Sequence, residues 1–350
     1  MFSNLRSLIF KLDPETAHNL AIKSLKFNFV PNISDENKDD PLFKTIMFNK
    51  DIENPIGIAA GFDKNAEVYN SLYKLGFGFV EVGTITPLKQ YGNPKPRVFR
   101  LVEDEALINR LGFNNLGAKN VVNRIKSNKP IGLLGINIGP NKETENRLGD
   151  YIECLKTFHE VADYITINIS SPNTEDLRNF HEQTKLNELL EIINKEKKIL
   201  NSKIPIVVKI SPDIDDQEIN KVSEVLLSNN IEVIIISNSS DSTRYSLIDI
   251  QKHQKGGLSG KPIEEKSTKL INKFYRILRG RIKIIGVGGV NSGKGAYEKF
   301  LAGANYVQLY TGMVFRGPNI INLIKKELKE LLLRDGVKNF SEIVGKNKIT

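Results

Sequence analysis

The segment 168–173 carries the side chains needed to bind a planar polar ligand and to move a proton on it. It reads Asn-Ile-Ser-Ser-Pro-Asn and directly follows the apolar run 164–167. Asparagine offers both a donor pair and an acceptor, which suits an amide or imide ligand. Buried polar groups cost free energy unless they find partners, so this cluster predicts a site with something to bind. A polar turn that only closes a strand is the alternative, because turns favour the same residue types.

Two lysines stand beside or within apolar runs. Lys209 is the fourth residue of the run Ile-Val-Val-Lys-Ile, and Lys64 follows Gly61 by three positions. A lysine among apolar residues must find an anion or lose its charge. A reduced flavin carries negative charge near N1 and O2, which a fixed lysine would stabilise. A structural salt bridge remains the alternative for Lys209.

Glycine-rich turns indicate where a phosphate group would bind. The segments 286–289 (Gly-Val-Gly-Gly) and 311–312 (Thr-Gly) follow the last two expected strands, and the last two βα loops of a barrel commonly bind phosphate through backbone N–H groups. The segment 256–260 (Gly-Gly-Leu-Ser-Gly) predicts another loop where backbone can approach a ligand. No GxGxxG fingerprint opens the first βα turn, so NAD is not the expected cofactor. No Ser-His-Asp order or carboxylate pair favours a hydrolase.

These residues need a scaffold, and eight short β-branched runs alternate with helical segments. The near-continuous Ile and Val runs predict strands buried on both faces of a parallel sheet. Eight β-α units over about 250 residues predict a TIM (β/α)8 barrel. An open doubly wound sheet is the alternative, but polar or glycine residues end nearly every run and favour the barrel. The expected strands are 55–61, 79–86, 133–139, 164–170, 205–210, 231–238, 283–289 and 306–312, and helices are expected at 186–200, 216–229 and 266–278.

Chemistry in such a barrel gathers at the carboxyl ends of the strands. One polar strand end is unremarkable, but a ring of them predicts a single site. The residues at the expected strand ends are Gly61 with Asp63 and Lys64, Thr84, Asn137, Asn168, Lys209, Asn238, Gly288 with Gly289, and Tyr310 with Thr311 and Gly312.

The first 40 residues predict a helical hairpin appended to the barrel, which itself spans 41–340. Apolar residues recur at helical spacing from Phe2 to Leu12, and Asp13 with Pro14 begins a second helix as its N-cap and first residue. The polar stretch 32–40 is expected to be a linker. A packed cap and an element for a membrane surface or a lipid-soluble ligand are both open interpretations.

Composition excludes several classes of protein. The single cysteine, Cys154, excludes disulfides, a cysteine-based zinc site and an iron–sulfur cluster within this chain, and the four histidines show no metal-binding spacing, so no metal is expected. No run of about 20 apolar residues predicts a membrane-spanning helix, and charged residues interrupt any cleavable signal pattern. The net charge of +9 indicates a solvated, lysine-rich surface with some attraction to anionic membranes. No motif favours nucleic acid.

Four motifs together resemble the dihydroorotate dehydrogenases. They are Ala-Ala-Gly-Phe-Asp-Lys at 59–64, Asn-Arg-Leu-Gly-Phe-Asn-Asn at 109–115, the segment 168–173, and Ile-Gly-Val-Gly-Gly at 285–289. The similarity runs from about Leu12 to Lys325. The hairpin, with Leu-Asp-Pro-Glu at 12–15 and His18, resembles the membrane-associated, quinone-using class. Soluble members use a cysteine as base, whereas Ser171 stands at that position here.

The resemblance implies an FMN enzyme of pyrimidine (UMP) synthesis that oxidises (S)-dihydroorotate to orotate and reduces ubiquinone or menaquinone. Ser171 would remove the C5 proton while the C6 hydride moves to flavin N5, and the enzyme would lie peripherally on the cytoplasmic side of the cell (inner) membrane. The implied FMN contacts are Ala60, Gly61, Phe62, Asp63, Lys64, Thr84, Asn137, Asn168, Lys209, Ser237, Gly260, Gly289, Tyr310 and Thr311. Orotate would contact Lys64, Asn109, Arg110, Leu111, Gly112, Phe113, Asn168, Asn173, Asn238 and Ser239. The residues implied near the quinone are His18, Arg100 and Tyr310.

One departure from the family pattern stands at 237–240, where Ser-Asn-Ser-Ser replaces expected threonines around the asparagine. Serine keeps the hydroxyl, so the contacts are expected to survive with less restricted rotamers. Other readings remain open: an FMN barrel acting on another pyrimidine or an enone, a non-redox phosphate-binding barrel, and a non-enzymatic interaction protein. The identity of the quinone and the oligomeric state are also open, a monomer being one option.

Overall fold

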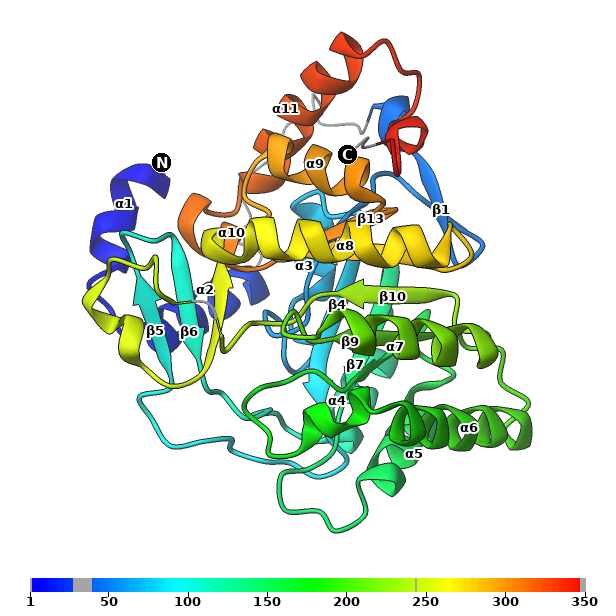
Figure 1. Ribbon diagram of the computed structural model, residues 1–350. Helices are drawn as coiled ribbons and strands as arrows, with labels where there is room; N and C mark the ends of the chain where they lie inside the picture. The colour runs from blue at the N-terminus through cyan, green and yellow to red at the C-terminus, as the bar shows by residue number, and fades with distance from the viewer. Residues whose placement is uncertain (1, 28–39, 243, 347–350) are drawn as a thin grey trace.

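Eight parallel strands close into a barrel in the order β10-β12-β13-β3-β4-β7-β8-β9, and helices surround it (Figure 1). The structure, a computed structural model, describes residues 2–27, 40–242 and 244–346. The barrel strands are β3 (Ile56–Ile58), β4 (Phe79–Ile85), β7 (Leu133–Ile138), β8 (Tyr164–Asn168), β9 (Ile206–Ile210), β10 (Val233–Ile236), β12 (Lys283–Val287) and β13 (Tyr306–Leu309). Each lies within one of the eight predicted strands, so the predicted TIM barrel is confirmed.

The surrounding helices cover the outer faces of the strands and bury a continuous apolar layer between helices and barrel. Because both strand faces are buried, the strands read as near-continuous apolar runs. The three helices predicted from periodicity are confirmed as α6, α7 and α8. The helices around the barrel are α3 (Tyr69–Lys74), α4 (Ala118–Ser127), α5 (Arg147–Phe158), α6 (Gln183–Ile199), α7 (Asp216–Ser228), α8 (Glu264–Leu278), α9 (Gly293–Ala302), α10 (Thr311–Arg316) and α11 (Ile320–Arg334).

A second, smaller apolar cluster fills the interior of the barrel. Side chains alternate along each strand, so Phe79 and Val207 face inward and pack with Tyr164 and Tyr306. A hairpin of two short strands, β1 (Thr45–Met47) and β2 (Lys50–Ile52), covers the amino-terminal end of the barrel. It adds Met47 to this cluster, and its Ile46 carbonyl accepts a hydrogen bond from the Tyr306 hydroxyl at 2.6 Å. The interior is therefore closed at one end and open to ligand at the other.

A three-stranded antiparallel sheet stands beside the open end of the barrel (Figure 1). Its order is β11-β6-β5, made of β5 (Val98–Leu101), β6 (Ala106–Asn109) and β11 (Gly257–Gly260). The sequence did not indicate β5 or β6, because each has four residues and carries a polar or charged side chain. The expectation of a loop at 256–260 was wrong: Gly257–Gly260 pairs with β6 along its whole length.

The N-terminal hairpin consists of α1 (Phe2–Ile9) and α2 (Pro14–Lys26), as predicted. Asp13 caps α2 by accepting a hydrogen bond from the Thr16 amide at 2.9 Å, and Pro14 is the first helical residue. Glu15 of α2 forms a two-point ion pair with Arg97, at 3.0 and 2.6 Å, which fixes α2 to the segment before β5. The predicted linker 32–40 lies outside the described residues except for Asp40. Within the described ranges, no helix is long and apolar enough to cross a membrane.

Candidate active site

A cavity opens at the carboxyl ends of the barrel strands, and most of the predicted site residues line it. The loops after β3, β8, β10, β12 and β13 contribute, together with β6 and β11 of the added sheet. Lining residues from the predicted cofactor set are Ala60, Gly61, Lys64, Thr84, Asn168, Lys209, Ser237, Gly260, Gly289, Tyr310 and Thr311. Lining residues from the predicted substrate and base set are Asn109, Leu111, Gly112, Phe113, Ser171, Asn173, Asn238 and Ser239.

Four of the residues predicted to contact FMN or orotate do not line this cavity. Asp63 is buried and accepts three backbone N–H bonds, from residues 65, 67 and 68, so it shapes the loop after β3. Asn137 lies beneath the cavity. Arg110 points away, with its guanidinium donating to the carbonyls of Lys255 and Pro96 at 3.0 Å each. Phe62 packs edge-on against His18 and Tyr310 and lines a second cavity.

A chain of hydrogen bonds links side chains of β4, β7 and β8 and of the loop after β10, and it orients the asparagine amides. Asn137 Nδ2 donates to Glu81 at 2.8 Å, and its Oδ1 accepts from Thr84 Oγ1 at 2.6 Å and from Asn168 Nδ2 at 3.2 Å. Asn168 Oδ1 in turn accepts from the Ser170 hydroxyl at 3.0 Å and from Asn238 Nδ2 at 3.4 Å. A carboxylate only accepts hydrogen bonds, so Glu81 fixes the direction of the whole chain.

Glu81 is the residue that the sequence analysis missed. It is fully buried in the barrel interior, where its carboxylate also accepts hydrogen bonds from Tyr164, Thr166 and Gln308 at 3.1 to 3.3 Å. The signal was present, because Glu81 interrupts the apolar run Phe-Val-Glu-Val just as Lys209 interrupts its own run.

Lys209 is the buried cation of the same interior. Burial lowers its pKa, and the negative charge of Glu81 opposes that effect. The side chain reaches the cavity lining, and within the described residues its ammonium group has no hydrogen-bond acceptor. The arrangement leaves a buried positive charge that an anionic or strongly accepting ligand group would stabilise.

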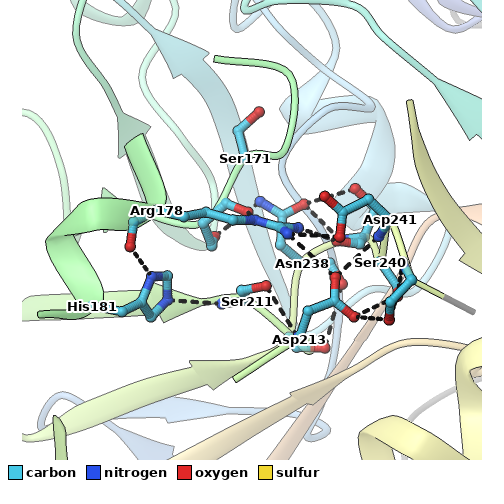
Figure 2. A network of polar contacts seen from close by, with 12 residues as sticks. Ser171, Arg178, His181, Ser211, Asp213, Asn238, Ser240 and Asp241 are labelled. Atoms are coloured by element: carbon cyan, nitrogen blue, oxygen red, sulfur yellow. Dashed lines mark hydrogen bonds and ion pairs between the residues drawn. The ribbon is translucent and has the colours of Figure 1, made fainter. Parts of the chain in front are cut away.

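Ser171 lies on the loop after β8, at the cavity wall. Its Oγ accepts a hydrogen bond from the backbone N–H of Asn173 at 3.2 Å. The hydroxyl points away from the network around Arg178 (Figure 2). Cys154, by contrast, is buried in α5 outside the cavity, and burial raises the pKa of its thiol well above its ordinary value. Of these two side chains, only Ser171 is placed to act on a ligand in the cavity.

A second cavity of about 370 Å³ lies between the N-terminal hairpin and the added sheet. Its walls are mainly apolar side chains of α2, with residues of α1, β5, β6 and α10. The three residues predicted near a quinone, His18, Arg100 and Tyr310, all line it. Arg100 is buried: it donates to the Phe10 carbonyl at 3.1 Å, while its Nε has no partner within the described residues.

Lys64 and Tyr310 line both cavities, as do Val98, Leu107 and Leu111, so these residues form the wall between them. Lys64 Nζ donates to His18 Nε2 at 3.4 Å. Burial lowers the pKa of Lys64 to about 8, although the negative charges of Glu15 and Asp63 oppose this. Burial and the neighbouring Lys64 charge lower the pKa of His18 well below its ordinary value, so the imidazole is neutral and can accept. Burial raises the pKa of Tyr310 to about 12, so its hydroxyl keeps its proton.

Comparison with known proteins gives one consistent answer. The family model described as "Dihydroorotate dehydrogenase" matches residues 42–332. "Dihydroorotate dehydrogenase (quinone)" of Bartonella henselae is 46% identical over 95% of this chain and 92% of its own length. The protein of the same description from Rhizobium rhizogenes is 43% identical over 96% of this chain and 93% of its own length. A crystal structure of DHODH from Eimeria tenella in complex with ferulenol superposes with a TM-score of 0.92 at 36% identity, covering 97% of this chain and 96% of that chain.

Proposed function

Because this chain belongs to the dihydroorotate dehydrogenase family, we propose that it oxidises (S)-dihydroorotate to orotate and passes the electrons to a quinone, in the synthesis of pyrimidines. The observation that carries the proposal is the pair of cavities that share the wall of Lys64 and Tyr310. One presents several asparagine amides and suits the dihydropyrimidine. The other is apolar and faces the hairpin, and it suits a lipid-soluble acceptor.

FMN is the cofactor that fits the first cavity. Lys209 presents a buried cation without an acceptor among the described residues, as the N1–O2 edge of a flavin requires. After β12, Gly289 has φ +78° and a Cβ there would lie 2.6 Å from the Glu264 Cα, so only glycine permits this turn, whose backbone N–H groups would hold the phosphate. Thr84, Asn168 and Thr311 offer hydroxyl and amide groups between these two ends. When bound, FMN supplies the hydride acceptor and the link to the quinone.

The substrate would lie against the asparagines of the first cavity. Asn109, Asn173 and Asn238 each present an amide that can donate and accept, which matches the alternating C=O and N–H groups of the pyrimidine ring. The Lys64 ammonium would face the substrate carboxylate. Ser171 would hold the C5 proton at its Oγ, and the proton would leave through neighbouring hydroxyls or water because serine is a weak base.

The acceptor would lie in the second cavity. Arg100 Nε is a buried donor without a partner in the described part of the chain, and a quinone carbonyl is an acceptor of the right kind. His18 and Tyr310 lie between that donor and the first cavity, with ring centroids 6.3 Å apart. The apolar walls supplied by α2 suit a hydrophobic ring and tail.

The hairpin would also attach the enzyme to a membrane surface. Leu5, Leu8, Leu20 and Phe27 are exposed by 45, 63, 50 and 72%, which is unusual for one short segment. Arg6, Lys11 and Lys23 add positive charge to the same segment. Apolar area and basic charge together favour peripheral attachment to an anionic bilayer.

The direct test is anaerobic mixing of the purified protein with dihydroorotate. The visible absorbance of the protein should correspond to one flavin per chain. This absorbance should bleach on mixing. A protein without flavin, or one whose flavin is bleached by another dihydropyrimidine but not by dihydroorotate, would contradict the proposal.

The S171A variant tests the base. It should keep FMN and bind orotate, yet its flavin should bleach more slowly by on the order of 100- to 10,000-fold, the usual contribution of a positioned acid or base. S170A removes a neighbouring hydroxyl that bonds Asn168 and Asn238 instead, so it should slow bleaching less than S171A does. A near-normal bleaching rate in S171A would remove Ser171 from the mechanism.

A further inference from the structure

Arg178 is an arginine outside the two cavities that ties three active-site loops together (Figure 2). It lies in the short helix Leu177–His181, which follows β8. Its Nε donates to the Ser170 carbonyl at 3.2 Å, and its Nη2 donates to the Ser239 carbonyl at 3.1 Å. Ser170 immediately precedes the proposed base Ser171, and Ser239 immediately follows Asn238. The guanidinium therefore spans the base loop and the loop that holds the substrate amide.

Two acids hold the guanidinium in this orientation. Arg178 Nη1 donates to Asp241 at 2.9 Å and lies 3.3 Å from Asp213, which is on the loop after β9. Although burial alone would raise the pKa of Asp213, hydrogen bonds from residues 240, 241, 242 and 266 hold it below its ordinary value. Asp213 therefore stays ionised, and a planar guanidinium that is paired in this way has a fixed direction.

The helix that carries Arg178 is itself anchored to the barrel. His181 Nδ1 donates to the Arg178 carbonyl at 2.8 Å, and His181 Nε2 accepts the Ser211 amide at 3.1 Å, just beyond β9. This tautomer follows from its two partners. Burial lowers the pKa of His181, so the ring stays neutral and can donate from Nδ1 while it accepts at Nε2.

We propose that Arg178 is a positioning residue that sets the distance between Ser171 and Asn238, and so between the base and the bound substrate ring. The proposal rests on the proposed function of Ser171 as the base. No other charged side chain among the described residues donates to both the Ser170 and the Ser239 carbonyls. Lysine in its place would keep one ion pair but has no planar fork to reach both carbonyls.

The test is a double-mutant cycle between R178Q and S171A, read as the rate of flavin bleaching by saturating dihydroorotate. In the presence of Ser171, R178Q should slow bleaching by about 10- to 100-fold, since a misplacement of about 1 Å has this effect on a positioned group. In the S171A background, R178Q should slow flavin bleaching by less than about threefold, because that variant has no base left to misplace. R178K should lie between R178Q and wild type.

Controls separate this role from a loss of folding. All variants should retain one FMN and the wild-type melting temperature within a few degrees, and R178K replaces R178Q in the cycle if R178Q does not fold. R281Q is the matched control, since Arg281 also donates to two carbonyls, at 3.2 and 3.3 Å, but does so at the other end of the barrel.

The outcomes distinguish the two proposals. An equal fold-loss from R178Q with and without Ser171 would overturn the positioning role while leaving the base intact. If dihydroorotate did not bleach the flavin of the wild-type protein, the proposed function would be overturned. If the flavin of S171A bleached at the normal rate, Ser171 would not be the base, and the positioning role of Arg178 would fall with it. A full effect in R281Q would show that any lost arginine slows the reaction, and it would also overturn the positioning role.

Discussion

Glu81 and Lys209 place two opposite charges inside a barrel whose neighbouring positions are apolar. Both side chains are buried, and Glu81 accepts hydrogen bonds from Asn137, Tyr164, Thr166 and Gln308. These hydrogen bonds satisfy both carboxylate oxygens, and the one to Asn137 gives the strand-end amides one orientation. The polar residues that meet the ligand are thus oriented from below, by an acid that does not line the cavity.

The E81Q variant tests this orientation. Glutamine has one acceptor and one donor group where glutamate has two acceptors, so at least one buried donor should lose its partner. The expected loss is about 1–3 kcal/mol in the free energy of unfolding, measured by urea denaturation of the holoenzyme. FMN should also bind more weakly, because the charge opposite Lys209 is gone.

The matched control for E81Q is E265Q, at a fully exposed position of α8. It should change neither the unfolding free energy nor FMN affinity. Wild-type stability and full FMN affinity in E81Q would show that the amide chain keeps its orientation without the carboxylate.

If Lys64 faces the orotate carboxylate as proposed, orotate binding should depend on pH. Its pKa is lowered to about 8 in the free enzyme, and a bound carboxylate would raise it, because the anion favours the charged ammonium. Affinity should therefore be full below pH 8 and fall as the pH rises above it. The dissociation constant of orotate should rise by up to roughly tenfold per pH unit, measured by the flavin difference spectrum from pH 6.5 to 9.5.

The K64M variant supplies the comparison for this profile. It should bind orotate weakly at every pH and show no break near pH 8. A wild-type profile that is flat across this range would mean that Lys64 does not face the carboxylate.

The hairpin α1–α2 supplies half of the residues that line the second cavity. The ion pair between Glu15 and Arg97 holds α2 in place. Although burial opposes it, Arg97 lowers the pKa of Glu15. A carboxyl with a depressed pKa stabilises the folded state above its unfolded pKa, and that contribution is lost as the pH falls through the folded value. Docking of the hairpin should therefore be intact at neutral pH and weaken only in acid.

Removing residues 1–40 should impair quinone reduction more than flavin bleaching by dihydroorotate. The second cavity loses its α2 wall, whereas the residues that line the first begin at Ala59. Stopped-flow bleaching and the steady-state quinone assay measure the two half-reactions separately. Equal loss of both would identify the hairpin as a folding cap.

The L8D variant isolates membrane attachment from the cavity, because Leu8 is 63% exposed and does not line the cavity. It should reduce co-sedimentation with vesicles of phosphatidylglycerol and phosphatidylcholine and leave both half-reactions with a water-soluble quinone unchanged. Unchanged sedimentation of both L8D and the truncated protein would contradict the attachment of the hairpin to lipid.

The barrel was predictable because its strands are buried on both faces and are therefore long apolar runs that end in polar residues. The helices α6, α7 and α8 were predictable because their apolar residues recur at helical spacing and each segment lies between two expected strands. The strands β5 and β6 were not, because four residues with Arg100 or Asn109 among them give no period to count. For the same reason, β11, which has four residues of which two are glycines, was expected to be a loop.

The first cavity was predictable because a barrel brings all its strand ends together, so residues distant in sequence needed only the correct strand assignment. Contacts made by long side chains were not predictable. Arg110 belongs to a predicted motif but turns outward, and Arg178 spans three loops that no sequence pattern connects. Glu81 could have been found by the argument applied to Lys209, since each is one charge in an apolar strand.

The wall between the two cavities also limits how the protein can change during evolution and how inhibitors can discriminate. Lys64 and Tyr310 line both cavities, so a substitution at either position would alter the two cavities at once. Ala17, Leu20 and Ala21 of α2 line the second cavity alone and can vary without altering the first. A compound that gains its affinity from these α2 side chains can be selective among related enzymes and is open to escape by substitution. A compound that binds to Lys64 and Tyr310 instead would contact residues whose substitution would also alter the cavity proposed for the enzyme's own substrate.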